Sequence, residues 1–450
     1  MKRALVLGPI VAVVCACGSA ANGVGRGDGA AGGSAGSSGG AAAGSSTGGT
    51  SLGGSSASGG APGAGGTSGA GAGGGAAGGT TGFAGAGTGG IGTGGSPTCE
   101  EGLALSAGVW TDITPPGLNL STTFGVNDVE VAPSDPCILY AAVDQNGMYK
   151  STNAGASWDK LGTGSPSNGT STTILDSPLH MRIDPNDANH LYAVQGVRGT
   201  TEGFWVTTDG GDTWTMPQAF ADGASVWTRD VYSVNYEPGD FDHILLTFHY
   251  GWSNNASEDS GVVESTDGGA TWETHYQAGF SHGNVATFLS NGQTWLLGTQ
   301  DHGFWRTSDG GSTWNKVTDN SMSHGGVQLY RSQANDALYA GIWNGLLRSI
   351  DDGITWKSLN GDNGIAYTGY MAVIGDGTNL FTMTSCACMG TPKNDPYITS
   401  AESDGLSWAQ YNGGDQKFGN GPFSMSYAPG PGIIYSANWD AGVWALKIAP

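Results

Sequence analysis

Short stretches of alternating or continuous hydrophobic positions recur along the chain from residue 109 onward, with turn residues between them. Val129–Val131 alternates apolar and charged positions, the turn Asp135–Pro136 follows, and Ile138–Ala142 is a short apolar run. A further stretch opens with glycine at Gly147. Such segments, bounded by Gly, Pro and Asp, predict antiparallel strands joined by tight turns. The succession returns at intervals of roughly 50 residues, which indicates a repeat of four-stranded units.

An eight-residue motif closes five of these units. It begins with Ser or Thr, has Asp or Asn at its third position and Gly at its fifth, and ends in Trp. The copies are residues 151–158, 207–214, 265–272, 307–314 and 349–356. A degenerate sixth copy ends at Trp408 and has Ser403 in place of the acid. Because Asp and Gly favour a tight turn and Trp buries a large apolar area, we assign all six copies a structural role and exclude them from the active site.

The motif matches the Asp-box, S-x-D-x-G-x-T-W, of BNR repeats. Residues 109–450 therefore resemble the propellers of sialidases, sortilin-type receptors, photosystem assembly factors and xyloglucanases. The resemblance implies a β-propeller in which each box closes the hairpin between the two outer strands of a blade, away from the ligand-binding face.

The number of units predicts how the ring closes. Six units end at the boxes, and a seventh begins at Phe423 and ends near Trp444 after three strands. Val109–Ile113 supplies the missing strand. We therefore predict an all-β fold, a seven-bladed propeller of four-stranded antiparallel blades. Closure by the N-terminal strand of the domain leaves no exposed sheet edge.

One face of such a ring collects the loops that enter the inner strands and the loops between the two middle strands. In this sequence those loops carry carboxylates, imidazoles and aromatic rings. Sugar rings stack on aromatic side chains and carboxylates bind their hydroxyl groups, so this face predicts carbohydrate binding. The alternative for any single residue is a role in a turn or in packing. The candidate ligand-binding residues are His180, Asp230, Trp252, His282, His302, His324, Trp343 and Trp439.

A glycoside hydrolase is the main alternative. Tyr140–Lys150 resembles the first-blade motif of xyloglucanases, Y-x-x-T-D-x-G-G-x-Y-R, which implies that Asp144 is one of the two carboxylates needed for inverting hydrolysis. That family takes its second carboxylate from another propeller, so Asp301 or Asp440 of this ring would have to replace it. Sialidase activity is disfavoured, because it needs an arginine triad and residues 98–450 hold six arginines, two of them beside boxes.

A metal site is a further alternative. His180, His282 and His324 begin equivalent inner strands, and Cys386 and Cys388 are soft ligands in a middle loop. Copying of a Ser-His-Gly turn between neighbouring repeats explains the two later histidines without a metal. We assign no metal site and expect no cofactor.

The first 17 residues have the pattern of an export signal. A basic head, Met1–Arg3, precedes an apolar run of 11 residues, Ala4–Val14, which is too short to span a bilayer. Val14–Gly18 resembles the bacterial lipobox, which implies lipidation at Cys17, and an ordinary secretory signal is the alternative. We expect residues 1–17 to be a lipoprotein signal peptide. The protein would then be an exported bacterial lipoprotein at the outer membrane, at the cell surface or in the periplasm.

Composition separates a linker from the folded part. Residues 18–97 hold 35 of the 82 glycines of this 450-residue chain, whereas all 15 tryptophans follow residue 97. We expect residues 18–97 to be a disordered Gly/Ala/Ser/Thr-rich linker and residues 98–450 to be the propeller. The latter carry 13 basic and 37 acidic residues. This balance argues against nucleic acid or an anionic membrane as a partner, because phosphates are neutralised by Lys and Arg.

Four cysteines besides Cys17 remain after export, and they allow three pairings. Cys99 precedes the closing strand and Cys137 lies in a turn of the first blade, so we prefer a Cys99–Cys137 bridge; Cys386 and Cys388 are the other two.

We expect a lipid-anchored monomer whose partner is a polysaccharide or another extracellular polymer, and which meets the membrane only through its anchor. The alternatives from other classes are a glycoside hydrolase that uses Asp144 with a second carboxylate, and a protein-binding assembly scaffold.

Overall fold

The computed structural model describes residues 103–161, 176–196, 201–223, 226–249, 251–252, 259–320, 326–361, 363–385, 394–411 and 416–448. All described residues belong to the unit of residues 80–450. Among these residues, no helix combines the length and the hydropathy needed to cross a membrane.

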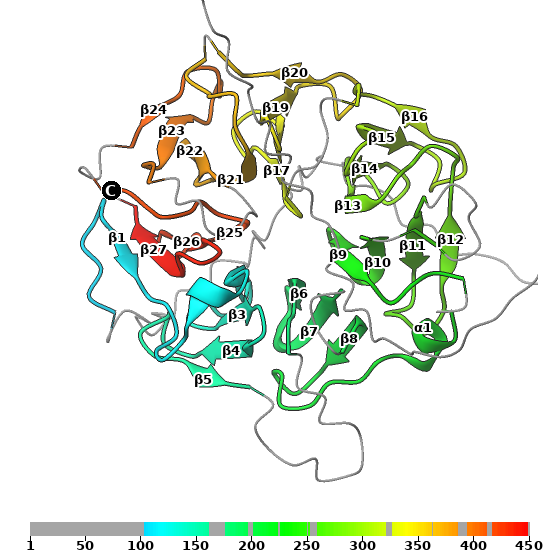
Figure 1. Cartoon of the computed structure of the whole chain (residues 1–450), viewed down its shortest axis with the longest axis horizontal. Helices are drawn as coiled ribbons and strands as arrows, with labels where there is room; N and C mark the ends of the chain where they lie inside the picture. Colours follow the sequence, from blue (N-terminus) through cyan, green and yellow to red (C-terminus); the bar gives the residue numbers. More distant parts are fainter. Residues whose placement is uncertain are drawn as a thin grey trace, which may run out of the picture. The chain divides into compact units, whose positions relative to one another are not determined.

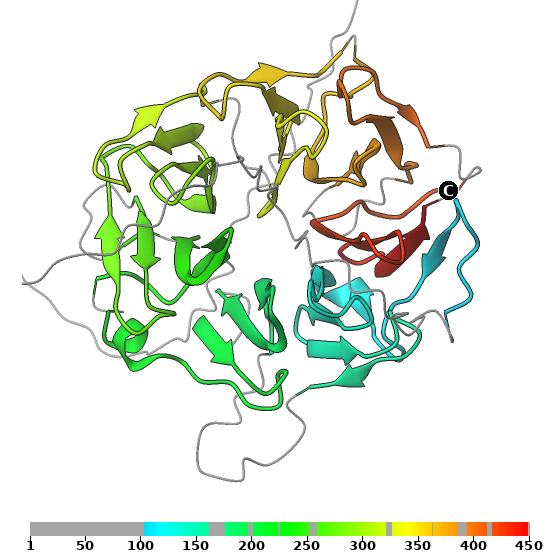
Figure 2. The same cartoon turned by 180° about the vertical axis from the view of Figure 1, so that it is seen from behind.

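Seven antiparallel sheets form the blades of a ring, seen from its two sides in Figure 1 and Figure 2. Blade 1 contains β2 (Val126–Val131), β3 (Leu139–Val143), β4 (Gly147–Ser151) and β5 (Asp159–Lys160). Blade 2 contains β6 (His180–Asp184), β7 (Asp187–Gln195) and β8 (Gly203–Thr207). Blade 3 contains β9 (Val231–Glu237), β10 (Asp240–Phe248), β11 (Val262–Ser265) and β12 (Glu273–His275). Blade 4 contains β13 (Gly283–Phe288), β14 (Trp295–Thr299), β15 (Phe304–Thr307) and β16 (Asn315–Lys316).

The remaining blades follow the same order from the inner to the outer strand. Blade 5 contains β17 (Leu329–Arg331), β18 (Leu338–Ile342), β19 (Gly345–Ser349) and β20 (Lys357–Ser358). Blade 6 contains β21 (Tyr370–Gly375), β22 (Asn379–Thr384), β23 (Ile398–Ala401) and β24 (Ala409–Gln410). Blade 7 contains β25 (Ser424–Ala428), β26 (Ile433–Ala437), β27 (Val443–Lys447) and β1 (Trp110–Asp112). The helical segments of the described residues are a 3₁₀ turn, Leu120–Thr122, and α1 (Gln218–Gly223). The prediction of a seven-bladed propeller is confirmed.

The ring closes through β1, as the sequence predicts. This strand pairs antiparallel with β27, with Trp110 opposite Leu446, and Figure 1 shows the cyan β1 beside the red β27. Trp110 is buried and stacks on Tyr397 of blade 6 with ring centroids 4.1 Å apart. Because the first strand completes the last sheet, the two ends of the domain hold each other in place.

Blade 2 is the exception to the four-stranded pattern among the described residues. A single bridge between Val206 and Thr215 stands where the fourth strand is expected. Beyond it, α1 places the fully buried Phe220 against Phe204 and Trp227, at ring-centroid distances of 6.0 and 5.9 Å. Aromatic packing from the short helix therefore covers this part of the blade.

The box of blade 2 illustrates how hydrogen bonds within the motif hold the turn. In blade 2, the amide of Thr213 donates to Asp209 Oδ1 at 2.9 Å and its hydroxyl donates to Oδ2 at 2.5 Å. Gly211 has a φ of +94°, which favours glycine, and its carbonyl accepts a bond from Trp214 Nε1 at 3.1 Å. Both oxygens of the Asp209 carboxylate are used inside the turn, in keeping with the structural role expected for the boxes.

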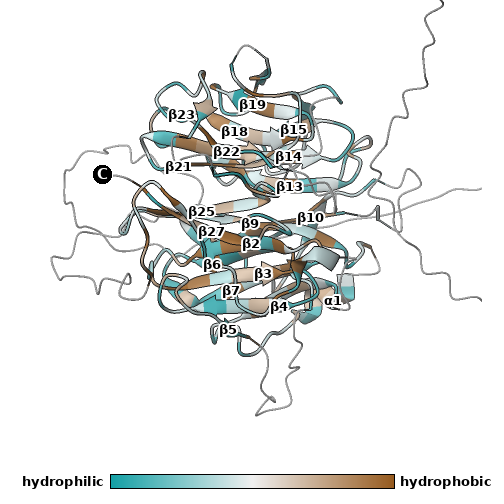
Figure 3. Ribbon diagram, turned by 60° about the vertical axis from the view of Figure 1, so that its left-hand side comes forward, coloured by the Kyte–Doolittle hydropathy of each residue, from teal (hydrophilic) through white to brown (hydrophobic). Residues whose placement is uncertain are grey.

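The core lies between neighbouring blades rather than within one. Tyr140 of blade 1, Met181 of blade 2 and the box residue Trp214 belong to one buried cluster. Figure 3 shows that hydrophobic residues concentrate along the strands and hydrophilic residues in the connections. Burial of these apolar side chains between sheets is the main force that holds the blades together.

Candidate functional site

An apolar cluster lies where the inner strands of the ring begin. Its buried members are Leu179, Tyr232, Val327, Met371, Phe423 and Trp439, and Phe124 and Trp343 pack against it while staying partly exposed. Most of these residues start an inner strand or precede one, and Trp343 and Trp439 belong to the β18–β19 and β26–β27 loops. The structure therefore brings together the two classes of loop that the sequence predicts on one face. We call this group the central cluster.

Trp439 anchors the central cluster and is itself buried. Its ring lies 4.3 Å from that of Phe423 and 6.2 Å from that of Phe124, and its Nε1 donates to Ser385 Oγ at 3.0 Å. Its backbone exchanges two hydrogen bonds with Val126 of blade 1, at 2.9 and 3.1 Å. Trp439 thus joins blades 7 and 1, while Phe124 and Trp343 are the rings that reach the surface.

Asp144 is fully buried behind Phe124. Its Oδ2 accepts a hydrogen bond from the Phe124 amide at 2.9 Å, and its Oδ1 accepts one from the Ser177 hydroxyl. Its own amide donates to the carbonyl of Gly125 at 2.8 Å. The carboxylate therefore holds the loop that presents Phe124 and links it to the entrance of blade 2.

Asp301 and Asp440, the two proposed partners of Asp144, are exposed. Asp440 follows Trp439 and accepts a bond from Asn420 Nδ2 at 3.1 Å. Asp301 lies in the β14–β15 connection, which corresponds to the β18–β19 loop that carries Trp343. Both carboxylates thus belong to loops of the class that reaches the central cluster.

The other expected ligand-binding residues have mostly structural partners. Asp230 Oδ2 lies 3.2 Å from His249 Nδ1, within hydrogen-bond distance. Trp252 is buried and packs edge-on against Phe248 at a centroid distance of 5.6 Å. His302 is half-buried, with its Nδ1 2.9 Å from the carbonyl oxygen of Gly279.

The histidines of the metal-site alternative belong to no group of three or more possible metal ligands within the described part of the chain. His180 is fully buried, and its Nδ1 accepts a bond from the Val234 amide at 3.2 Å. Burial lowers the pKa of His180 well below its usual range, and the nearby Arg182 charge adds to this effect. His282 is half-buried. His324, Cys386 and Cys388 lie outside the described residues, as do Cys17 and Cys99.

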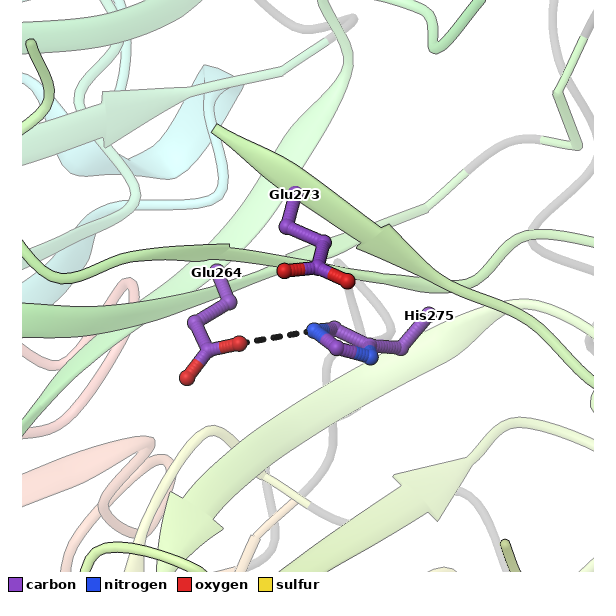
Figure 4. A group of neighbouring side chains, drawn as sticks. All are labelled: Glu264, Glu273 and His275. Carbon is purple, nitrogen blue, oxygen red and sulfur yellow. Dashed lines mark hydrogen bonds and ion pairs between the residues drawn. The ribbon is translucent and has the colours of Figure 1, made fainter. Parts of the chain in front are cut away.

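A different group, on the outer strands of blade 3, gathers three side chains capable of binding a metal. Glu264 comes from β11, and Glu273 and His275 come from β12. One ligand atom from each residue lies within 4.8 Å of the others, and Figure 4 shows the three side chains pointing toward one another. They line a cavity of about 450 Å³, together with Thr274, Tyr276, Gln293 and the box residues 309–312 of blade 4.

Two histidines and two glutamates form a hydrogen-bonded chain through this group. His275 Nε2 lies 2.8 Å from Glu264 Oε2, and His243 Nε2 lies 2.7 Å from Glu264 Oε1. His243 Nδ1 in turn lies 2.7 Å from Glu237 Oε2. Burial opposes the charge on His243, but its bonds to the two glutamates outweigh that effect and raise its pKa. Burial would raise the pKa of Glu264, yet the bonds from His243 and His275 lower it to about 2.

This group was not predicted from the sequence, because all candidate residues came from the loops of the expected ligand-binding face. A signal was present in the repeat itself. Glu273 and His275 are the first and third residues after the box tryptophan, and alternate residues of a strand share a face. The equivalent positions in blade 4 are Asn315 and Val317, and neither pairs an acid with an imidazole.

No family model matches the chain, and no curated protein matches it. Among solved structures, Ycf48 from Cyanidioschyzon merolae is 10% identical with a TM-score of 0.52, over 75% of this chain and 99% of that chain. The extracellular domain of a B. thetaiotaomicron protein described as a hybrid two-component system is 12% identical with a TM-score of 0.53, over 73% of this chain and 40% of that chain. An ancestral GH74 enzyme is 19% identical over 76% of this chain and 38% of that chain, but its TM-score of 0.37 carries no argument about activity. At these identities the likenesses show the propeller fold alone.

Proposed function

We propose that this chain is an exported β-propeller that binds a glycan or another extracellular polymer, with Phe124 and Trp343 as its aromatic contact surface. The observation that carries this proposal is the central cluster, in which six buried side chains support two rings that stay partly exposed. Aromatic rings bury large apolar areas against the flat faces of sugars. Because the support is rigid, little conformational entropy is lost when a ligand stacks on these rings.

The charge of the domain favours a neutral polymer as the ligand. Residues 98–450 carry 13 basic and 37 acidic residues, and Asp301 and Asp440 expose carboxylates on loops of the same face. Carboxylates accept hydrogen bonds from hydroxyl groups and repel anionic chains at short range. A neutral polysaccharide fits this surface better than an acidic one.

Binding is favoured over hydrolysis by the environment of Asp144. A general acid or base in glycoside hydrolysis must come within hydrogen-bond reach of the glycosidic oxygen or of a water beside it. Asp144 is fully buried, and its two oxygens accept bonds from Phe124 and Ser177. These contacts support a positioning role for the carboxylate.

The proposed location follows from the first 97 residues. Lipidation at Cys17 would anchor the chain, and residues 18–97 would tether the propeller to the membrane. A Gly-rich tether of 80 residues has a root-mean-square reach of roughly 50 Å, enough for the domain to sample polymer around its anchor.

Affinity electrophoresis and calorimetry of the purified full chain on xyloglucan, other β-glucans and acidic bacterial polysaccharides would test the proposal. We expect saturable binding to a neutral polymer and a loss of about tenfold or more in Trp343→Ala, as for an aromatic anchor. The matched control is Trp356→Ala, which removes a half-buried box tryptophan from the same blade. Equal loss in both variants, or binding to none of the polymers, would contradict the proposal and favour a protein partner.

A further inference from the structure

We propose that Glu264, Glu273 and His275 form a binding site for a divalent transition-metal ion, of which Zn²⁺ is the best probe. The site is separate from the central cluster, because it lies on the two outer strands of blade 3. The proposal is independent of the polymer-binding function.

The strand register places two negative charges in direct opposition. Glu264 of β11 pairs with Glu273 of β12, so the two carboxylates are cross-strand neighbours on one face of the blade. Like charges in this arrangement destabilise a sheet. His275 lies two residues after Glu273 and therefore projects from the same face. A cation between the three side chains would convert the repulsion of the glutamates into attraction.

The donor atoms are close enough to share one ion. Glu264 Oε2 and His275 Nε2 are 2.8 Å apart, and the whole set of donors spans no more than 4.8 Å. A tetrahedral ion with bonds of about 2.0–2.2 Å needs donors roughly 3.3 Å apart. Glu273 has an exposed side chain and can meet this distance by rotation, without a change in the backbone.

A second layer of contacts fixes the half-buried carboxylate of Glu264. Glu264 uses Oε2 toward His275, while its Oε1 lies 2.7 Å from His243 Nε2, and His243 is held by Glu237 on its other side. Partners of this kind orient the ligands of known metal sites and contribute to affinity. The ring of His275 is also confined, because it meets Trp295 edge-on at 5.0 Å and a Cβ at Gly311 would come within 2.5 Å of its Nδ1.

The cavity explains where the remaining coordination positions would point. Three protein ligands leave at least one position open, and the ligands line a space of about 450 Å³ with Gln293 and the blade 4 box. That space accommodates water or a small anionic ligand. One imidazole and two carboxylates suit Zn²⁺, Mn²⁺ or Fe²⁺, whereas Ca²⁺ requires six to eight oxygen ligands.

The test uses the purified full chain after dialysis against a chelator. We expect calorimetry to show about one Zn²⁺ bound per chain, with a rise in melting temperature, and Co²⁺ to give the visible absorption of a low-symmetry site with nitrogen and oxygen ligands. Glu273→Gln removes an exposed ligand, so the fold is kept while Zn²⁺ affinity falls by at least about tenfold. His275→Gln should act in the same direction.

Asp212→Asn is the matched control, since it removes one exposed charge two residues before the box tryptophan of another blade. It should bind Zn²⁺ as the unmodified chain does. Absence of saturable binding, or binding that is equally strong in Glu273→Gln, would overturn the proposal.

Discussion

The backbone amide of Phe124 donates a hydrogen bond to the carboxylate of Asp144 at 2.9 Å. Asp144 follows β3 and Phe124 precedes β2, so the bond fixes the entrance of blade 1 relative to its own middle loop. The residue that a catalytic motif singles out in the sequence is thus the residue that holds an aromatic ring at the proposed binding surface. Replacement of Asp144 therefore tests both the hydrolase alternative and the binding proposal.

Replacement of Asp144 should affect stability and binding rather than catalysis. Asp144→Ala leaves the Phe124 amide and the Ser177 hydroxyl without their acceptor, at a cost of about 1 to 3 kcal/mol in the free energy of unfolding. Polymer affinity should fall with it, because the Phe124 loop loses its support. Urea unfolding and affinity electrophoresis measure the two effects, with Asp212→Ala in the blade 2 box as an exposed control. Release of reducing ends by the unmodified chain, abolished in Asp144→Ala, would instead restore the hydrolase interpretation.

A second buried carboxylate connects blades 5 and 6. Glu402 is fully buried, and it accepts bonds from the Tyr330 hydroxyl at 2.7 Å and from the amides of Gln333 and Gly377 at 2.8 and 2.7 Å. We expect Glu402→Ala to lower the free energy of unfolding by about 3 kcal/mol, since the buried Tyr330 hydroxyl and two backbone amides lose their common acceptor. Denaturant unfolding checks this value.

Glu402→Gln should lower the free energy of unfolding less than Glu402→Ala does. The amide oxygen of the glutamine keeps two of the bonds, while its NH₂ group faces the Gly377 amide. A cost below about 1 kcal/mol for Glu402→Ala would show that the residue does not couple the two blades.

Repetition explains why the fold could be predicted. The box, with Asp209 and Trp214 in one copy, depends on contacts within a few residues, so each copy can be recognised in the sequence alone. Closure by Trp110–Asp112 followed from counting strands. Neither step required knowledge of how one blade packs on the next.

The candidate site was harder to predict because burial depends on contacts between blades. The loops that carry Asp144 and His180 have polar sequences typical of a ligand-binding face, yet both side chains are fully buried. The Ser177 hydroxyl donates a hydrogen bond to Asp144, and the Val234 amide donates one to His180. Each donor is more than 30 residues away from its acceptor in the sequence. Glu264 and His275 were not predicted because they lie beside a box, and the boxes were expected to lie away from the ligand-binding face.

The box carboxylates should make the domain sensitive to acid. Hydrogen bonds from Thr271 and Thr313 lower the pKa values of Asp267 and Asp309 below the ordinary value of 3.8. On acidification the unfolded chain therefore takes up protons first, so the stability from these groups is complete above about pH 4 and is lost as the pH falls further. Urea unfolding between about pH 5 and pH 2.5 measures how steeply the free energy of unfolding falls with pH. This is the slope that we compare between variants. It should be shallower in a double variant, Asp267→Asn with Asp309→Asn, and unchanged in Asp212→Asn.

The turn before β3 should be tied covalently to the segment ahead of the closing strand. Cys137 is disulfide-bonded, and no other cysteine occurs among the described residues, so its partner lies outside them. We predict that the partner is Cys99, which stands 11 residues before Trp110 of β1. Loop closure on this scale contributes up to about 4 kcal/mol. Peptide mapping without reductant should recover a Cys99–Cys137 fragment, and Cys99→Ser should lower the melting temperature as much as Cys137→Ser. Recovery of Cys137 linked to Cys386 or Cys388 would contradict the prediction, because the bridge would then join blade 1 to blade 6.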